Sequence, residues 1–269
     1  MTLSQALGLG VLQGATEFLP VSSSGHLALA RACLPQAQSS GLLFEVIVHL
    51  GTLGAIALVL RRRLAELLRA LPSLGTRRPL APERALARRW LLLIALASVP
   101  TALIGLSLRG AVERMHEQPS RVGVALLATG GILLAAERFG RRERGPGELG
   151  VADALSIGVA QGIGVLPGIS RSGSTVAAAL WRGARPEVAV EFSILLSVPA
   201  VLGANLLEIT RAGASGVRGE IVPLAVGFVA AFVTGTLSLT ALRWVVVRRR
   251  LIPFALYCAT VGGGALLLG

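Results

Sequence analysis

Long apolar runs alternate with short polar connections along nearly the whole chain. Six of these runs continue for about the twenty residues that a helix needs to cross a bilayer, and we predict them as transmembrane helices. They cover residues 42–60, 90–108, 122–137, 188–209, 221–242 and 251–268. The pattern therefore predicts an all-α integral membrane protein with six transmembrane helices.

Two further apolar segments, residues 3–32 and 150–182, are interrupted at their centres. Glu17, Pro20 and a serine run break the first segment, and Pro167 with two nearby glycines breaks the second. Each half is about a dozen residues long, which is too short to cross a bilayer. We therefore predict two re-entrant helix-loop-helix pairs, each of which enters and leaves on the same side of the membrane.

The two interrupted segments repeat one design. Gln13-Gly14 recurs 148 residues later as Gln161-Gly162, and the serine run that starts at Ser22 recurs 148 residues later at Ser170. This spacing predicts one membrane domain, residues 1–269, built from halves of approximately 1–145 and 146–269. Each half adds three spans to a re-entrant pair, so the halves start on opposite sides. Such an inverted-topology repeat places the two broken segments opposite each other near the middle of the membrane.

Composition and charge agree with a membrane protein. The chain is 53% hydrophobic and only 15% charged, with a mean hydropathy of +0.72. Its formal net charge of +12 comes from arginines, which collect in the connections 61–89, 138–144 and 243–250. By the positive-inside rule these connections are cytoplasmic, so the charge indicates topology beside anionic lipid and excludes a nucleic-acid partner.

Polar side chains gather at both predicted breaks. An arginine inside apolar sequence is costly and normally faces a cavity or a partner, and Arg171 is flanked by serines. Free backbone N–H groups and two helix N-termini would converge with it, which favours an anion such as pyrophosphate. The substrate-binding residues that we predict are Ser22, Ser24, Gly25, Gly168, Ser170, Ser172, Gly173 and Thr175.

Four side chains predict chemistry as well as binding. Phosphoryl transfer needs positioning, charge stabilisation, a nucleophile and a proton carrier, and Glu17, Ser23, His26 and Arg171 supply these groups. A helix that starts near Ser24 would place the His26 imidazole close to the Ser23 hydroxyl. Glu17 and Gln13, four residues apart, offer oxygen ligands for Mg²⁺ or Ca²⁺. Spacing leaves open whether Ser23 attacks phosphorus or orients a water molecule.

Plainer interpretations stand beside these. Glycines permit close helix packing in membranes, Glu17 could relay protons or cap a helix, His26 could be a satisfied core histidine, and Arg171 could form a structural ion pair. A secondary transporter or lipid flippase is the rival function, because inverted repeats with broken helices are a transporter design. A carrier needs binding without a nucleophile, so phosphate release in detergent separates the two.

Two motifs carry a resemblance to a known family. Residues 13–26 read Gln-Gly-Ala-Thr-Glu-Phe-Leu-Pro-Val-Ser-Ser-Ser-Gly-His, and residues 167–175 read Pro-Gly-Ile-Ser-Arg-Ser-Gly-Ser-Thr. Both resemble the signatures of the undecaprenyl-diphosphate phosphatases associated with bacitracin resistance. The resemblance covers essentially the whole chain. Two positions depart from it: Gln13 stands where many members carry glutamate, and His49 stands where we expect glutamine, so we assign no role to His49.

The resemblance implies a function. Members remove the terminal phosphate of a polyprenyl diphosphate and so recycle the lipid carrier for peptidoglycan and other cell-wall glycans. It implies that Glu17, Ser23, His26 and Arg171 are catalytic, that a divalent cation is needed, and that the site opens to the periplasmic side of the bacterial inner membrane. It also suggests a homodimer among membrane lipids.

Overall fold

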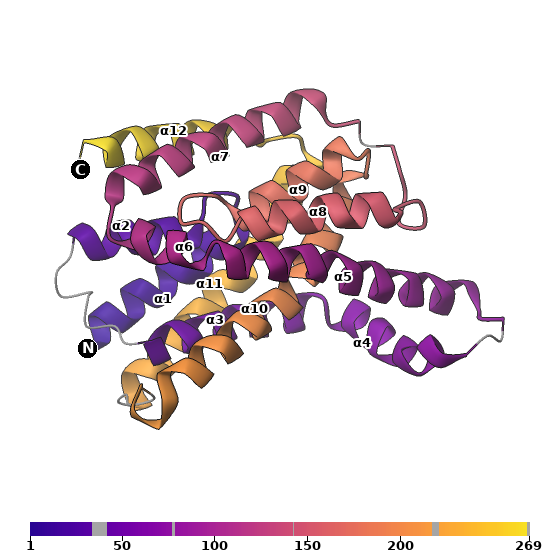
Figure 1. The fold of residues 1–269 in the computed structure, drawn as a ribbon, viewed down its shortest axis with the longest axis horizontal. Coiled ribbons are helices and arrows are strands. Elements are labelled where there is room, and N and C mark those ends of the chain that lie inside the picture. Colours follow the sequence, from indigo (N-terminus) through magenta and orange to yellow (C-terminus); the bar gives the residue numbers. More distant parts are fainter. Residues whose placement is uncertain (34–41, 77–78, 142, 217–220, 268–269) are drawn as a thin grey trace.

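The structure, a computed structural model, describes residues 1–33, 42–76, 79–141, 143–216 and 221–267, and within these ranges it contains helices and no strand. Figure 1 shows the helices lying roughly along one direction, with both termini at the same end of the molecule. The elements are α1 (Leu3–Phe18), α2 (Ser23–Cys33), α3 (Leu42–Val59), α4 (Arg61–Ala70), the 3₁₀ helix η2 (Leu71–Gly75), α5 (Pro82–Ser107), α6 (Arg109–His116), α7 (Pro119–Phe139), α8 (Val151–Ile163), α9 (Arg171–Trp181), α10 (Pro186–Gly216), α11 (Ile221–Val247) and α12 (Ile252–Leu266).

Each of the six predicted apolar runs contains a helix among its described residues. Within the described residues, four helices are long and apolar enough to cross a membrane, namely α5, α7, α10 and α11. α3 continues into α4 through an 85° bend and makes a fifth candidate with it, while α12 is a shorter apolar helix. The all-helical, multi-pass class is therefore correct, whereas the count of six spans stays a prediction.

Both predicted interruptions are real breaks in helices. α1 ends at Phe18 and α2 begins at Ser23, while α8 ends at Ile163 and α9 begins at Arg171. Pro20 and Pro167 lie within these breaks. Proline interrupts a helix because it lacks the backbone N–H that a continuing helix requires. Each break therefore leaves a short helix starting at a residue of the predicted polar cluster.

The two halves pack reciprocally. α1 lies against α11 of the second half, and α8 lies against α5 of the first half. α7 and α12 run side by side along one edge of the molecule (Figure 1). Glycines permit the close approaches: a Cβ added at Gly123 of α7 would lie 2.7 Å from the carbonyl oxygen of Gly262 of α12. The two predicted halves are therefore packed extensively against each other.

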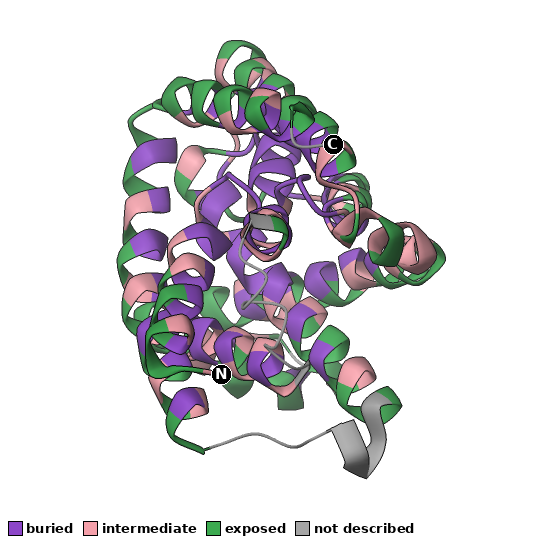
Figure 2. Ribbon diagram, turned by 90° about the vertical axis from the view of Figure 1, so that its left-hand side faces the viewer, coloured by how far each residue is buried: buried purple, intermediate pink, exposed green. Residues whose placement is uncertain are grey.

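The buried core follows the centre of the molecule, and the outer faces of the helices are exposed (Figure 2). Trp90, Phe192 and Leu196 are fully buried in this core. By contrast, Leu103 of α5 is 66% exposed and Leu237 of α11 is 67% exposed. Large apolar side chains on outward faces suit a hydrocarbon environment, because lipid tails are as apolar as leucine.

Connections that the sequence predicts as loops contain further helices. The arginine run after α3 forms the first turn of α4, η2 follows α4, and α6 follows α5. Arg63 of α4 is held by Glu191 of α10 at 2.7 Å and lies over the Trp90 ring at 4.5 Å. At the same end, Asp153 of α8 accepts hydrogen bonds from the Gly150 N–H at 2.8 Å and the Arg182 Nε–H at 2.6 Å. These contacts make the arginine-rich end part of the folded body.

Candidate active site

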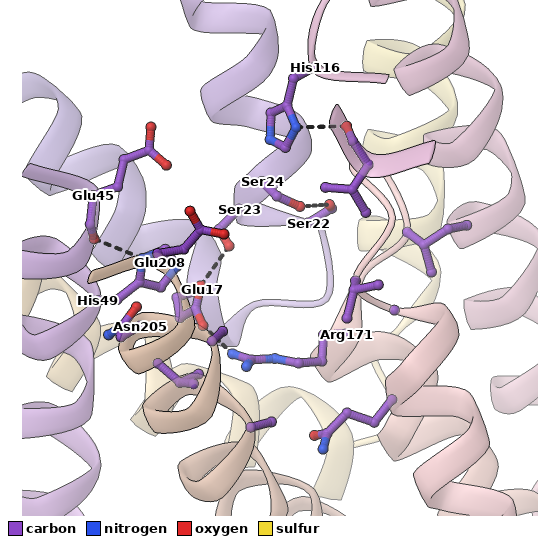
Figure 3. A pocket seen from close by; sticks show the side chains of 18 of the residues that line it. Glu17, Ser22, Ser23, Ser24, Glu45, His49, His116, Arg171, Asn205 and Glu208 are labelled. Carbon is purple, nitrogen blue, oxygen red and sulfur yellow. Dashed lines mark hydrogen bonds and ion pairs between the residues drawn. The ribbon is translucent and has the colours of Figure 1, made fainter. Parts of the chain in front are cut away.

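The breaks in α1–α2 and α8–α9 meet at one wall of a pocket of about 430 Å³. Figure 3 shows Glu17, Ser23 and Arg171 turned toward one another inside it, with His49 and Glu45 of α3 and Asn205 and Glu208 of α10 nearby. Polar residues of both breaks therefore line a common space.

Glu17 is the centre of this arrangement. Its side chain is only 4% exposed and forms an ion pair with Arg171 through Oε1. Its second oxygen, Oε2, accepts a hydrogen bond from Ser23 Oγ at 2.6 Å and another from Gln13 Nε2 at 2.9 Å. A buried carboxylate survives when it is paired and hydrogen-bonded in this way. Glu17 thus joins a guanidinium to a hydroxyl.

Direct contacts hold the two broken segments in register. Ser22 Oγ accepts a hydrogen bond from the Gly168 N–H at 3.0 Å, and Ser172 Oγ donates to the Leu19 carbonyl at 3.2 Å. On the other side of the second break, Thr129 of α7 donates to the Gly168 carbonyl at 2.8 Å and accepts from the Ser170 N–H at 3.0 Å. Backbone groups that the breaks leave without helical partners are therefore satisfied by side chains.

Gly168 is required at its position. Its φ of +95° is a conformation that residues with a side chain rarely adopt, and an added Cβ would lie 2.5 Å from the Val122 carbonyl oxygen. Gly25 packs on the same place, since a Cβ there would lie 2.8 Å from the Gly168 nitrogen. These two glycines allow the segments to touch.

The predicted residues divide into two groups. Six of the thirteen line the pocket: Glu17, Ser22, Ser23, Ser24, Ser170 and Arg171. The others lie behind its wall: Gln13, Gly25, His26, Gly168, Ser172, Gly173 and Thr175. Thr175 donates to the carbonyl oxygen of Arg171 at 2.9 Å, and the Gly173 N–H donates to Ser170 Oγ at 3.0 Å as part of the α9 N-cap. The second group shapes the loops that carry the first, and direct substrate binding by Gly25, Gly168, Ser172, Gly173 and Thr175 stays a prediction.

His26 has hydrogen-bond partners at both of its ring nitrogens. Its Nδ1 is 2.8 Å from the Ser22 carbonyl oxygen, and its Nε2 is 2.8 Å from the hydroxyl of Tyr257 on α12, whose ring stacks on the imidazole. The Ser23 hydroxyl is directed to Glu17 instead. Ser23 and His26 thus have different hydrogen-bond partners, and the predicted proximity of the imidazole to the Ser23 hydroxyl stays a prediction.

Several pocket residues were not assigned from the sequence. His49 lines the pocket, its Nδ1 is 2.8 Å from the Glu45 carbonyl oxygen, and it lies close enough to Glu17 and Arg171 to interact electrostatically. A backbone carbonyl only accepts, so Nδ1 carries the proton and Nε2 is the nitrogen left for other partners. The signal was present in the sequence: Glu45 and His49 are four residues apart on one apolar helix, and so share a face.

The mouth of the pocket carries charges of both signs. Arg31 forms an ion pair with Glu45, and Arg109 pairs with Glu113 at 2.9 Å. Three arginines and four glutamates line the pocket in all, because Arg171, Glu17 and Glu208 add to these two pairs. An anionic ligand here would meet a small excess of negative charge.

Glu17 and Gln13 do not by themselves form a metal site. Both carboxylate oxygens of Glu17 are already engaged, and Gln13 donates its amide nitrogen toward Glu17 while its buried Oε1 has no partner. Across the described ranges, no group of three or more His, Cys, Asp or Glu side chains is arranged to hold a metal ion. The ligands predicted for Mg²⁺ or Ca²⁺ thus fall short of the six or more oxygens that these ions prefer.

Fold and site together define a multi-pass helical membrane protein with a buried ion pair and a serine between two broken helices. Comparison with known proteins then gives the family. The chain matches the family described as "Bacitracin resistance protein BacA" over residues 6–264, and it belongs to that family.

Curated relatives match along their whole length. The undecaprenyl-diphosphatase of Syntrophotalea carbinolica is 44% identical over 264 residues, covering 98% of this chain and 97% of the relative. The undecaprenyl-diphosphatase of Desulforapulum autotrophicum is 40% identical and covers 100% and 99%. That of Carboxydothermus hydrogenoformans is 38% identical and covers 100% and 98%.

Proposed function

We propose that this protein is an integral membrane phosphatase that hydrolyses undecaprenyl diphosphate to undecaprenyl phosphate and inorganic phosphate. The observation that carries the proposal is the contact of Glu17 with both Ser23 and Arg171 inside one pocket. The names of the relatives support the substrate. A lipid diphosphate also suits the surroundings, because its anionic head can enter a polar pocket while its chain stays in the bilayer.

In the proposed reaction, Arg171 binds the oxygens of the terminal phosphoryl group. Guanidinium donors fit phosphate oxygens bidentately and stabilise the charge of the transition state. Ser23 Oγ attacks the terminal phosphorus while Glu17, which already accepts its hydrogen bond, takes the proton. The bond from phosphorus to the bridging oxygen breaks, and undecaprenyl phosphate leaves with the electron pair. Water then cleaves the phosphoserine, and the proton returns from Glu17 to Ser23.

His26 takes a positioning role in this proposal. Its hydrogen bond to the Ser22 carbonyl holds the loop that precedes Ser23, and Tyr257 fixes the ring from α12. We therefore propose that His26 positions the catalytic loop and does not itself react, because both of its ring nitrogens have partners other than Ser23.

We propose a divalent cation, Mg²⁺ or Ca²⁺, as a companion of the substrate. The pocket's four glutamates outnumber its three arginines, so a diphosphate alone would face net repulsion. Glu17 is the one predicted ligand that lines the pocket, and diphosphate oxygens would supply further ligands of the kind that these ions prefer.

The membrane arrangement that we propose is the inverted repeat of three spans and one re-entrant pair in each half. Its support is the reciprocal packing of α1 with α11 and of α8 with α5. With the arginine-rich connections in the cytoplasm, the pocket opens on the periplasmic side of the inner membrane. The protein would then recycle the lipid carrier of cell-wall synthesis and confer bacitracin resistance, and we propose a homodimer as its working form.

Phosphate release by detergent-purified protein tests the proposal against the transporter alternative. Wild type, Glu17→Ala and Arg171→Ala would be given undecaprenyl diphosphate with and without Mg²⁺. We expect turnover by wild type alone. Wild-type protein that binds the lipid yet releases no phosphate in any metal would overturn the enzyme and favour a carrier.

A further inference from the structure

A second cavity, of about 640 Å³, lies at the opposite ends of the same two helices that border the active-site pocket. The pocket contacts Glu45 to His49 of α3 and residues 200–208 of α10, whereas the second cavity contacts Leu58 and Val59 of α3 and residues 187–194 of α10. The two share no lining residue. The second cavity is therefore a separate feature at the arginine-rich end of the molecule. We name it the basic cavity.

Positive charge exceeds negative charge in the basic cavity. Arg61, Arg62, Arg63 and Arg243 line it together with Glu187 and Glu191. Arg63 is committed to Glu66 at 2.8 Å and to Glu191 at 2.7 Å. Among the residues that the structure describes, neither Arg61, Arg62 nor Arg243 has an ion-pair partner within 4 Å. The cavity thus holds a surplus of two positive charges.

The remaining walls are apolar and continue onto the outer face. Leu60, Ile194 and Leu239 line the cavity, and Leu58 and Val59 beside them are 46% and 39% exposed. These exposed side chains lie at the end of a helix whose outward face suits hydrocarbon. A ligand with a charged head and a hydrocarbon chain would therefore place its head among the arginines while its chain leaves sideways into the bilayer.

We propose that the basic cavity binds the phosphate head of a lipid monophosphate in the leaflet at the arginine-rich end. A phosphate monoester carries about −1.5 to −2 charges at pH 7, which matches the surplus better than the single charge of a phosphodiester lipid. Arginine donors bind such an oxygen cluster bidentately. This inference does not depend on the phosphatase activity of the other pocket.

Binding of farnesyl monophosphate to detergent-purified protein tests this site. Arg171→Ala serves as the reference protein, because it removes the guanidinium that we propose as the phosphate ligand of the active-site pocket. In this background, we expect Arg62→Gln with Arg243→Gln to raise the Kd at least tenfold, and Thr240→Glu, which adds a negative charge to the wall, to raise it as well. Arg69→Gln, an exposed arginine of α4 outside the cavity, should leave the Kd unchanged.

Three results would overturn the inference. Equal affinity in the reference protein and all variants would mean that the arginines do not bind the head. Farnesol bound as tightly as farnesyl monophosphate would mean a purely apolar site. Inorganic phosphate bound as tightly as the lipid would mean a simple anion site.

Thermal denaturation of each variant separates lost binding from lost folding. In a chain with Arg171 intact, Arg62→Gln with Arg243→Gln should also keep wild-type phosphate release. A failure of this proposal is thereby distinguishable from a failure of the proposed phosphatase.

Discussion

Glu17 and Arg171 stand 154 residues apart in the chain and form an ion pair at the contact between its two halves. Arg171 is one-fifth exposed, on the side of the pocket, while the Glu17 carboxylate is almost fully buried. The guanidinium can therefore reach a ligand without leaving its partner, and the pair both joins the halves and prepares the anion site.

Arg171→Lys keeps the charge and removes the planar fork. We expect kcat/KM for phosphate release to fall by roughly 10²–10³, the order of loss when a donor to the transition-state oxygens is removed. Arg114→Lys, on an exposed residue of α6 outside the pocket, is the control and should stay within about twofold. Unimpaired turnover by Arg171→Lys would show that Arg171 contributes charge alone.

Loss of the Tyr257 contact with His26 and loss of His49 should affect activity differently. Tyr257→Phe removes the hydrogen bond to His26 Nε2, and we expect a loss below about tenfold because one neutral hydrogen bond contributes about 1 kcal/mol. His49→Ala removes a side chain from the pocket beside Glu17, so it should shift the pH profile of kcat/KM, which Tyr257→Phe should not. A pH profile that is shifted in Tyr257→Phe and unchanged in His49→Ala would indicate that His26, and not His49, takes part in the reaction.

Gly168→Ala should destabilise the protein and inactivate it. The φ of +95° costs an L-residue about 1–2 kcal/mol, and the contact with the Val122 carbonyl adds to this. Gly131→Ala on α7 is the matched control, because nothing lies within 4 Å of its added Cβ. Thermal denaturation should show a lower Tm for the first variant and an unchanged or higher Tm for the second. Equal Tm values would mean that the loop relaxes freely.

Asp153 should make stability depend on pH in the acid range. Burial alone would raise the pKa of this carboxyl. The Gly150 N–H and the guanidinium groups of Arg144 and Arg182 lower the pKa by more than burial raises it, so the net shift is downward. Its contribution is therefore present above the unfolded pKa, near 4, and is lost as pH falls through the folded value. The Tm gap between wild type and Asp153→Asn should be constant from pH 8 to 5 and shrink below about 4. A gap that widens in acid would reverse the sign.

Chelation should abolish turnover, and added Mg²⁺ or Ca²⁺ should restore it. Because Glu17 already spends both oxygens on protein donors, we expect calorimetry to detect little Mg²⁺ binding to the free protein and clear binding when methylene diphosphonate is present. Stoichiometric Mg²⁺ binding without the diphosphonate would show that the protein supplies a complete site.

Sequence reasoning located the breaks and the meeting of Glu17, Ser23 and Arg171, because proline, glycine and charge inside apolar sequence are strong local signals. It could not predict the hydrogen bond between His26 and Tyr257, because the two residues are 231 positions apart in the chain. It also missed the pocket position of His49, which is set by the packing of α3 against distant elements. Likewise, the sequence did not predict α4 as a packed helix, because its contacts with Trp90 and Glu191 are made between residues far apart in the chain.

Thr129 shows what the second motif needs from the rest of the chain. One hydroxyl on α7 serves both the Gly168 carbonyl and the Ser170 N–H. A buried backbone group left without a partner costs about 1–3 kcal/mol. The ten residues around Arg171 therefore do not determine their own conformation. In another helical scaffold, they would need a hydroxyl at the position of Thr129 on a neighbouring helix to keep the same backbone shape.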